Sequence, residues 1–276
     1  MKIKGFIKTT VVALTGYVVA FLFAVPYLHM LTTATKPDDE LFEMPALYLP
    51  TDWQWNNFIE TFNNAPIATY LKNSLIISIM ATLVVLIVAL PAAYYVARFK
   101  FRGRSIFLLL VLVTQMLSPV ALVVGIYREV VTLGLVNTFT SLVLVSAAFN
   151  LAFAIWIMAG FFSSIPSEIE DAAFIDGCSR FTALRKITIP LALPGIATAL
   201  IFTFIAAWNE FVIALTLTST IETRPLTVGI NTFIGQYQVQ WNYLFAAAVI
   251  SIIPVVILFS SIQKWLVSGL TAGSIK

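Results

Sequence analysis

EIEDAAFIDGCSRFTALRKITIP, the stretch from Glu168 to Pro190, places a run of charged and helix-forming residues in an otherwise strongly apolar chain. Apolar runs long enough to cross a membrane lie on both sides, so this stretch is a polar insert between two predicted spans. Of the 276 residues, 60% are hydrophobic and 11% are charged. Soluble domains carry about 25% charged residues, so the composition indicates an integral membrane protein.

Uncharged runs along the chain predict six transmembrane helices. A helix needs about 20 mostly apolar residues to cross the hydrocarbon core, and each run holds one such helix without forcing two. We expect one all-α membrane domain over residues 1–276, because no internal repeat or low-complexity linker divides the sequence. Pro91 and Pro119 are expected to interrupt the second and third helices. The predicted spans are 11–33, 74–97, 105–127, 139–162, 191–215 and 243–265.

The first apolar run has a second interpretation. Lys2, Lys4 and Lys8 in front of it are also typical of a signal peptide. The run continues past 20 residues and reaches Lys36 without a small-residue cleavage site, which favours an uncleaved first helix.

Basic residues are distributed unequally between the two sides of the predicted helices. With the N-terminus inside, twelve lie in inner segments and four in outer segments. Because cytoplasmic loops are enriched in Lys and Arg, this bias predicts that both termini and the polar insert are cytoplasmic. The inner residues are Lys2, Lys4, Lys8, Arg98, Lys100, Arg102, Arg104, Arg180, Arg185, Lys186, Lys264 and Lys276, and the outer ones are Lys36, Lys72, Arg128 and Arg224.

The polar insert is predicted to form two short helices joined by a glycine. Ser167 and Glu170 fit the S-x-x-E capping box that begins a helix, and acidic residues in its first turn suit the helix dipole. Gly177 is placed to end this helix in the left-handed conformation. A second helix is expected from about Ser179 to Ile187.

Two arrangements suit such an insert. One is a docking site for a soluble partner, because Ala172 and Ala173 leave a bare helix face that a partner's backbone can approach. The other is an amphipathic hairpin that rests on the inner leaflet of the membrane. The physical chemistry of these residues alone favours neither arrangement.

The insert resembles the signature loop of permease subunits in binding-protein-dependent ABC importers. That family's pattern is EAA, three residues, Gly, nine residues and then Ile-x-Leu-Pro. Here Asp171-Ala172-Ala173 precedes Gly177, and Ile187-Thr188-Ile189-Pro190 follows at the required distance. Ile189 replaces the family's leucine. Asp171 replaces a glutamate that the family uses to contact its ATPase, and Glu168 and Glu170 are placed to compensate.

Four further segments resemble the carbohydrate-importer branch of that family, specifically its maltose-type second permease with a short N-terminus. They are Thr35–Leu41, Leu133–Thr138, Trp208–Phe211 and Gln263–Gly273. They occur in the family's order, and together with the insert they extend the resemblance over most of the chain.

The resemblance implies a complete transport assembly. The chain would be a multi-pass subunit in the prokaryotic cytoplasmic (inner) membrane, surrounded by lipid and paired with a second, different permease. Two cytoplasmic ATPases would bind ATP and Mg and receive the inserts as coupling helices. An extracytoplasmic solute-binding protein would deliver a carbohydrate, a polyol or a glycerol phosphate.

The resemblance also implies which residues act at the ATPase. In the coupling loop, residues 166–190, they are Glu168, Glu170, Asp171, Ala172, Ala173, Asp176, Gly177, Arg180 and Phe181. The tail from Gly269 to Lys276 is expected to reach the same interface. The chain itself is expected to bind no cofactor and to catalyse no reaction, since it lacks a G-x-x-x-x-G-K-S/T phosphate loop.

Polar side chains inside the predicted spans mark a second candidate site. Such groups tend to face a bundle interior or a water-filled cavity, which makes them candidates for the solute pathway. The alternatives are that the amides tie helices together and that the glutamate is a gate or a structural anchor. The candidates are Gln115, Asn150, Trp208, Asn209 and Glu210.

Other functions fit the sequence less well. An autonomous ion-coupled transporter with Glu210 as its proton or sodium carboxylate is the alternative, but it leaves the polar insert unexplained. The only histidine, His29, and the only cysteine, Cys178, provide no metal motif, no catalytic Ser–His pair and no internal disulfide. A net charge of +3 gives no reason to expect nucleic acid as a partner.

Overall fold

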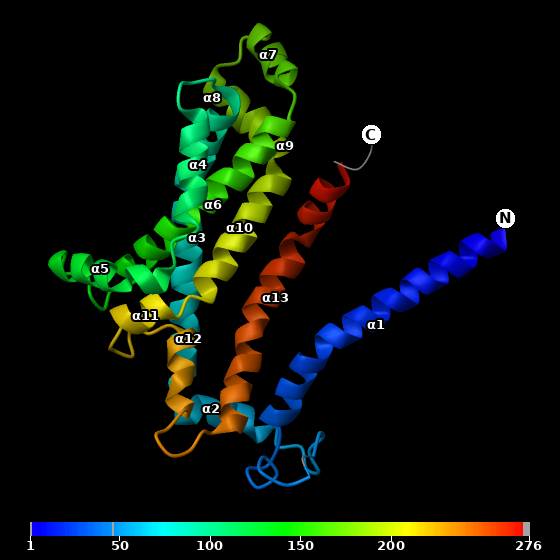
Figure 1. Ribbon diagram of the computed structural model, residues 1–276, viewed down its shortest axis with the longest axis vertical. Coiled ribbons are helices and arrows are strands. Elements are labelled where there is room, and N and C mark those ends of the chain that lie inside the picture. Colours follow the sequence, from blue (N-terminus) through cyan, green and yellow to red (C-terminus); the bar gives the residue numbers. More distant parts are fainter. Residues whose placement is uncertain (1, 46, 273–276) are drawn as a thin grey trace. The chain divides into compact units, whose positions relative to one another are not determined.

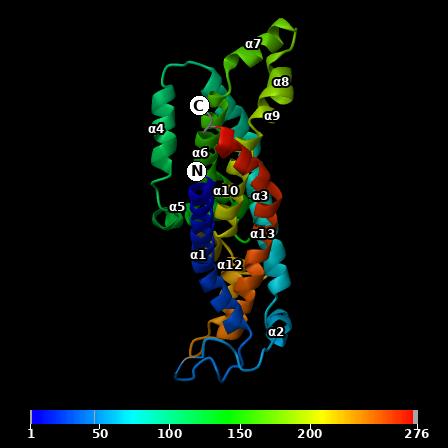
Figure 2. The same ribbon diagram turned by 90° about the vertical axis from the view of Figure 1, so that its right-hand side faces the viewer.

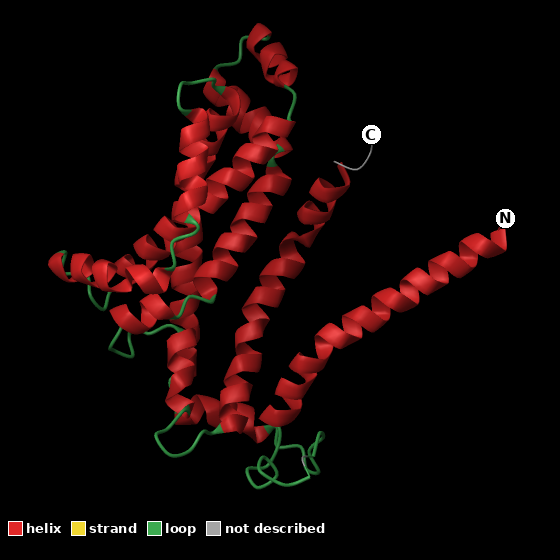
Figure 3. Ribbon diagram, in the orientation of Figure 1, coloured by secondary structure: helices red, strands yellow, loops and turns green. Residues whose placement is uncertain are grey.

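A computed structural model describes residues 2–45 and 47–272 of the chain. This part is helical and contains no β-strand, and one isolated antiparallel bridge joins Ile234 and Val239 (Figure 3). The all-α prediction is confirmed. The chain divides into two compact units, which are described separately: residues up to Ile67 together with Ile230–Ile253, and Ala68–Gly229 together with the residues from Pro254 onward.

The first unit contains two helices, a 3-10 turn and the beginning of a third helix. They are α1 (Lys2–Ala34), α2 (Asn56–Asn64), the turn Ile230–Phe233 and the part of α13 (Trp241–Ala272) up to Ile253.

Buried polar groups fold the chain between α1 and α2. The amide of Asn57 donates to the carbonyl oxygens of Ala34 (3.0 Å) and Lys36 (3.1 Å). The carboxylate of Glu40 accepts from the backbone N–H and the hydroxyl of Thr51. Because buried polar groups must be paired, the bonds to Thr51 account for the buried acidic side chain of Glu40 in the Thr35–Leu41 segment.

The second unit is built on three helices that pack along one another: α3 (Ile67–Arg98), α6 (Phe139–Ser164) and α10 (Leu193–Trp208) (Figure 1). Small buried residues at their contacts let the helix backbones approach closely. The fully buried alanines of this core are Ala89, Ala93, Ala154 and Ala199.

Four helices are long and apolar enough to cross a membrane, and up to six spans result if two bent helix pairs count as one span each. The predicted span 105–127 is interrupted before Pro119, as expected, and its two parts, α4 (Arg104–Thr114) and α5 (Pro119–Thr132), meet at 94°. Pro119 begins α5, a position where its missing N–H costs no hydrogen bond. Pro91 lies inside α3 without ending that helix.

The predicted span 191–215 is also broken. The helical run from Arg180 to Leu191 meets α10 at 75°, and Pro194 lies in the first turn of α10. α10 ends at Trp208, and a separate short helix, α11 (Val212–Leu217), follows. The unit also contains α12 (Leu226–Gly229) and the part of α13 from Pro254 to Ala272.

The loop before α6 explains one of the segments that carry the resemblance. Gly134 (φ 67°) and Asn137 (φ 58°) both adopt the left-handed conformation. The side-chain oxygen of Asn137 accepts from the backbone N–H of Ser219 (2.6 Å), and its amide donates to the Ser219 hydroxyl (2.8 Å). Thr138 then caps α6 by accepting from the N–H of Ser141 (3.2 Å). Asn137 thereby joins this loop to the segment that follows α11.

We expect Asn137→Ala to lower the free energy of unfolding by about 1–3 kcal/mol, because alanine loses the bonds to Ser219 and is strained at positive φ. Asn137→Gly is the matched control, since glycine loses the same bonds but accepts the backbone conformation. Thermal unfolding of the detergent-solubilised protein measures both. Midpoints equal to that of the wild type in both variants would show that this link contributes nothing.

Candidate functional site

The polar insert forms a helical hairpin at one end of the α3, α6 and α10 bundle (Figures 1 and 2). α7 (Ser167–Ile175) leads into the turn at Gly177. The second helical run comprises α8 (Arg180–Ala183), a π-helical turn (Leu184–Thr188) and α9 (Ile189–Leu191). The predicted second helix is present, and it continues past Ile187.

Gly177 ends α7 in the predicted left-handed conformation, with φ +82°. Its N–H donates to the carbonyl of Phe174 (3.1 Å), and the N–H of Cys178 donates to that of Ala173 (2.9 Å). This pair of bonds is a Schellman motif, which satisfies the last carbonyls of the helix. Ser179 then caps α8 by accepting from the N–H of Thr182 (3.2 Å).

The predicted capping box of α7 is wrong. Ser167 is already helical and makes no side-chain cap, and Glu170 does not return to its backbone N–H. Glu170 is instead 4% exposed and turned into the protein. Several partners inside the protein satisfy its carboxylate better than the single back-bond of a capping box.

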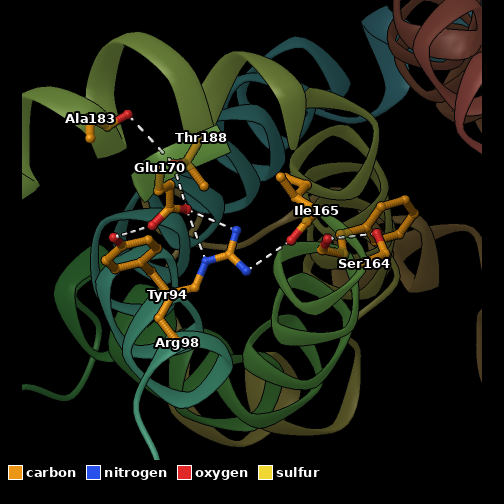
Figure 4. Close-up of polar contacts among 8 residues, drawn as sticks. Tyr94, Arg98, Ser164, Ile165, Glu170, Ala183 and Thr188 are labelled. Carbon is orange, nitrogen blue, oxygen red and sulfur yellow. Dashed lines mark hydrogen bonds and ion pairs between the residues drawn. The ribbon is translucent and has the colours of Figure 1, made fainter. Parts of the chain in front are cut away.

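Glu170 lies at the centre of a buried polar cluster formed with Tyr94, Arg98 and Thr188 (Figure 4). Its Oε2 accepts from the Tyr94 hydroxyl (2.9 Å), and its Oε1 accepts from Arg98 Nε (2.9 Å) and from the Thr188 hydroxyl (2.8 Å). Arg98 Nη2 also lies 2.8 Å from Oε1 in an ion pair. Arg98 Nη1 donates to the carbonyl of Ile165 (2.9 Å), between α6 and α7.

Sequence reasoning missed the roles of Tyr94, Arg98 and Thr188. Tyr94 and Arg98 are four residues apart at the end of α3, a spacing that puts them on one helix face. The spacing indicates that the two polar side chains lie together, but it does not identify Glu170 as their partner. Glu170 is 76 positions from Tyr94 and 72 from Arg98 in the sequence.

The remaining predicted coupling residues divide between an exposed and a buried face of the insert. Ala173 is buried, so only Ala172 of the alanine pair is open to a partner. Arg180 is exposed, and its guanidinium lies 5.1 Å from the ring centre of Phe99, in cation–π geometry. The other exposed predicted residues are Glu168, Asp171, Asp176, Gly177 and Phe181.

Two large apolar side chains project from the exposed face of the insert. Ile175 is 87% exposed and Phe181 is 71% exposed. Ile175 was missed by the sequence analysis, because an isoleucine in a helix is usually buried. Together with the exposed acidic residues Glu168, Asp171 and Asp176, they form what we call the outer face of the insert.

A cavity of about 220 Å³ in the second unit brings three of the predicted pathway residues together: Gln115, Asn150 and Glu210. The amide of Gln115 donates to the carbonyl of Phe149 (3.0 Å) and so ties the α4–α5 break to α6. The amide of Asn150 donates to the carbonyl of Ser146 (2.8 Å) within α6. The structure thus supports the interpretation that Gln115 links helices. Both Gln115 and Asn150 still line the cavity.

Trp208 and Asn209 do not line this cavity. Trp208 is 5% exposed and stacks on Phe204, with ring centres 5.8 Å apart. Asn209 is exposed at the end of α10.

Glu210 caps α11. Its two carboxylate oxygens accept from the backbone N–H groups of Ile213 and Ala214, both at 2.8 Å. The Thr227 hydroxyl donates to its backbone carbonyl (2.8 Å). This geometry is that of a structural anchor, one of the roles considered for it from the sequence.

We expect Glu210→Ala to lower the free energy of unfolding by about 1–2 kcal/mol, because two N–H groups at the start of α11 lose their acceptor. Glu129→Ala is the control, since it removes the same charge from an exposed site on α5. Thermal unfolding in detergent compares the two. Equal midpoints for these variants would contradict the capping role.

Comparison with known proteins places this geometry in a family. Residues 89–272 match the model of the "Binding-protein-dependent transport system inner membrane component" family. This match covers the last part of α3, all of α6 and α10, the polar insert and the cavity. The chain belongs to this family.

Relatives along the whole chain agree with the family match. This chain is 35% identical to the sulfoquinovosyl glycerol transport system permease protein SmoH of Agrobacterium fabrum, over 91% of this chain and 88% of the relative. It is 33% identical to the trehalose/maltose transport system permease protein MalG of Thermococcus litoralis, over 98% of each. The crystal structure of a bacterial ABC transporter involved in import of the acidic polysaccharide alginate has the same fold, with a TM-score of 0.77, 24% identity and coverage of 94% of this chain and 96% of that one.

Proposed function

We propose that this inner membrane component is a permease subunit of an ATP-driven importer for a carbohydrate or a related polyol or glycerol phosphate. The observation that carries the proposal is the polar insert, a helical hairpin whose outer face is exposed and whose buried Glu170 is bound by Arg98 of α3 and by Thr188. Permeases named for trehalose and maltose and for sulfoquinovosyl glycerol are among the relatives, which supports this solute class.

In the proposed assembly both termini and the insert are cytoplasmic, and residues 1–276 act as one transmembrane domain. A second, different permease completes the pathway, and two cytoplasmic ATPases bind ATP and Mg. A solute-binding protein outside the membrane delivers the solute. The chain itself carries no catalytic step and binds no nucleic acid. Gly273 and Lys276, which belong to the tail expected at the ATPase, lie outside the described residues.

The outer face of the insert is suited to a soluble partner. Exposed apolar side chains surrounded by charges are typical of the centre and the rim of a protein interface. Ile175 and Phe181 supply the apolar anchors, and Glu168 and Asp171 supply charge beside them. An ATPase bound to this face moves when it binds and hydrolyses ATP. That movement would shift the insert, and the insert would shift the bundle.

The cavity is the proposed solute pathway of this subunit. Gln115 Oε1 and Asn150 Oδ1 accept no hydrogen bond within residues 2–45 and 47–272, so both oxygens are available to sugar hydroxyls. Glu210 holds the wall of the cavity in shape by capping α11. Trp208 and Asn209 stay in the proposal only as supports next to Glu210, because neither lines the cavity.

Uptake of labelled solutes tests this function. A strain that lacks the gene is complemented with the wild-type chain and given a panel of mono-, di- and oligosaccharides, polyols and glycerol phosphate. Uptake of one panel member that depends on the chain identifies the solute. If no member depends on it, the carbohydrate assignment is wrong, and copurification with an ATPase then decides whether the importer assignment stands.

A further inference from the structure

The first helix of the insert, α7, is fastened to the bundle mainly through one carboxylate. α7 contains nine residues, of which only Glu170 and Ala173 are buried. Ala173 contributes one methyl group, whereas Glu170 receives bonds from α3 and from the π-helical turn. Arg98 extends this connection to Ile165, at the end of α6.

We propose that Glu170, Arg98, Tyr94 and Thr188 are positioning residues that transmit movement of the insert to α3 and to the re-entering chain. Glu170 does so without touching the ATPase. This inference rests on the proposed function and divides the acidic residues of the insert into two groups. Glu168 and Asp171 act outward on the partner, and Glu170 acts inward on the bundle.

The carboxylate of Glu170 is buried and is bound by partners inside the protein, so an outside partner does not reach it. Its Oε1 accepts from Arg98 and Thr188, and its Oε2 accepts from Tyr94. The side chains of Arg98 and Glu170 are 12% and 6% exposed. In such surroundings charge-assisted hydrogen bonds are strong and directional, so the linked groups move together.

The position of Thr188 adds a second route for the movement. Thr188 is fully buried and closes the π-helical turn Leu184–Thr188. Only α9 separates it from the 75° bend into α10. π-helical turns occur frequently at functional sites and interrupt the regular bonding of a helix. Displacement of Glu170 therefore pulls on the end of α3 through Arg98 and on the entry to α10 through Thr188.

Loss of this linkage should uncouple the two activities of the assembly. The outer face stays intact when Glu170 changes, so the ATPase still binds and hydrolyses ATP. Its movement is no longer passed to the bundle, so less solute crosses for each ATP. Changes on the outer face have a different effect. They lower the amount of ATPase that binds, but each bound ATPase still drives transport of the same amount of solute per ATP hydrolysed.

The test measures solute transported per ATP hydrolysed and the amount of ATPase that copurifies, in the complete complex reconstituted in liposomes with its binding protein. Glu170→Gln keeps the shape of the side chain but loses its charge, and we expect its transport per ATP to fall about tenfold. Tyr94→Phe and Thr188→Val each remove one hydroxyl, and we expect falls of about two- to fivefold. ATPase recovery should stay within about twofold of wild type.

Asp171→Asn is the matched comparison from the outer face, because it neutralises a carboxylate adjacent to Glu170 in sequence. We expect it to reduce ATPase recovery and to leave transport per ATP unchanged. The double variant Arg98→Glu with Glu170→Arg restores opposite charges at the two positions. It should recover part of the transport per ATP that each single variant loses. If Glu170→Gln does not accumulate in the membrane, Tyr94→Phe decides, since it removes a single oxygen.

Wild-type transport per ATP in the Glu170, Tyr94 and Thr188 variants would overturn the inference. The inference would also be overturned if Glu170→Gln lowered the amount of copurified ATPase as much as it lowers transport, because Glu170 would then act in docking. The proposed function fails on a separate result, namely that no ATPase copurifies with the wild-type chain.

Discussion

Gly177→Pro is expected to abolish solute uptake while the chain stays in the membrane. Gly177 has φ +82°, whereas proline fixes φ at about −65°. Proline also removes the N–H that donates to the Phe174 carbonyl at 3.1 Å. The Schellman turn cannot form, and the outer face loses its geometry. The bundle is unaffected, because Gly177 is exposed and lies outside its core.

A substitution series at Gly177 separates backbone strain from steric conflict. No atom lies within 4 Å of an added Cβ, so the cost of any substitution is conformational. Asparagine tolerates the left-handed region and should keep most uptake, and alanine should lose about 1 kcal/mol of turn stability. Initial uptake rates, normalised to the amount of chain in the membrane, measure the series. Wild-type uptake by Gly177→Pro, or equal losses for asparagine and proline, would contradict the role of the turn.

Gly195→Ala is expected to cause the largest loss of stability. An added Cβ would lie 2.3 Å from Cγ and 2.5 Å from Cβ of Phe161, where α10 packs on α6. The Cβ of Phe161 does not move when its χ1 angle changes, so another rotamer leaves the 2.5 Å contact in place. Overpacking of this kind costs about 1–3 kcal/mol or more. The thermal midpoint of the detergent-solubilised protein should fall, and less chain should accumulate in the membrane.

Two further variants make this prediction specific. Gly160→Ala changes a helical glycine of α6 that has no atom within 4 Å of an added Cβ, so it should not lower the midpoint. Phe161→Ala combined with Gly195→Ala removes the ring but keeps its Cβ, so stability should return only in part. Equal midpoints for Gly195→Ala and Gly160→Ala would show that the helices separate at no cost.

The sequence analysis predicted what depends on local patterns. Apolar runs gave the helical class, and Gly177 gave the turn of the insert, because a left-handed helix end favours glycine whatever the surrounding fold. Pro119 predicted an interruption of the third span, but neither the 94° bend there nor the 75° bend at Ala192 followed from the sequence. Counting apolar residues measures the length of a span and contains no information about its direction, so a 94° bend between two apolar helices leaves that count unchanged.

The roles of Glu170 and Glu210 show where such patterns fail. Glu170 matched a local capping box, but partners more than 70 positions away bind its carboxylate. Glu210 looked like an ionisable group in a span, yet it caps a short helix that begins two residues further on. In both cases the side chain took the best-satisfied arrangement in the folded chain. The partners of Glu170 are distant in the sequence, whereas the bonds of Glu210 are local and depend on the end of α10 at Trp208.

The most direct test of the central claim is photo-cross-linking from the outer face of the insert. A benzophenone amino acid replaces Ile175, which is 87% exposed, and in a second chain it replaces Met116, which is 83% exposed in the α4–α5 break. Illumination of membranes should join an ATPase subunit to the chain from position 175 and not from position 116. Products containing only lipid from position 175 would contradict the account, because the insert would then rest on the membrane instead of holding an ATPase.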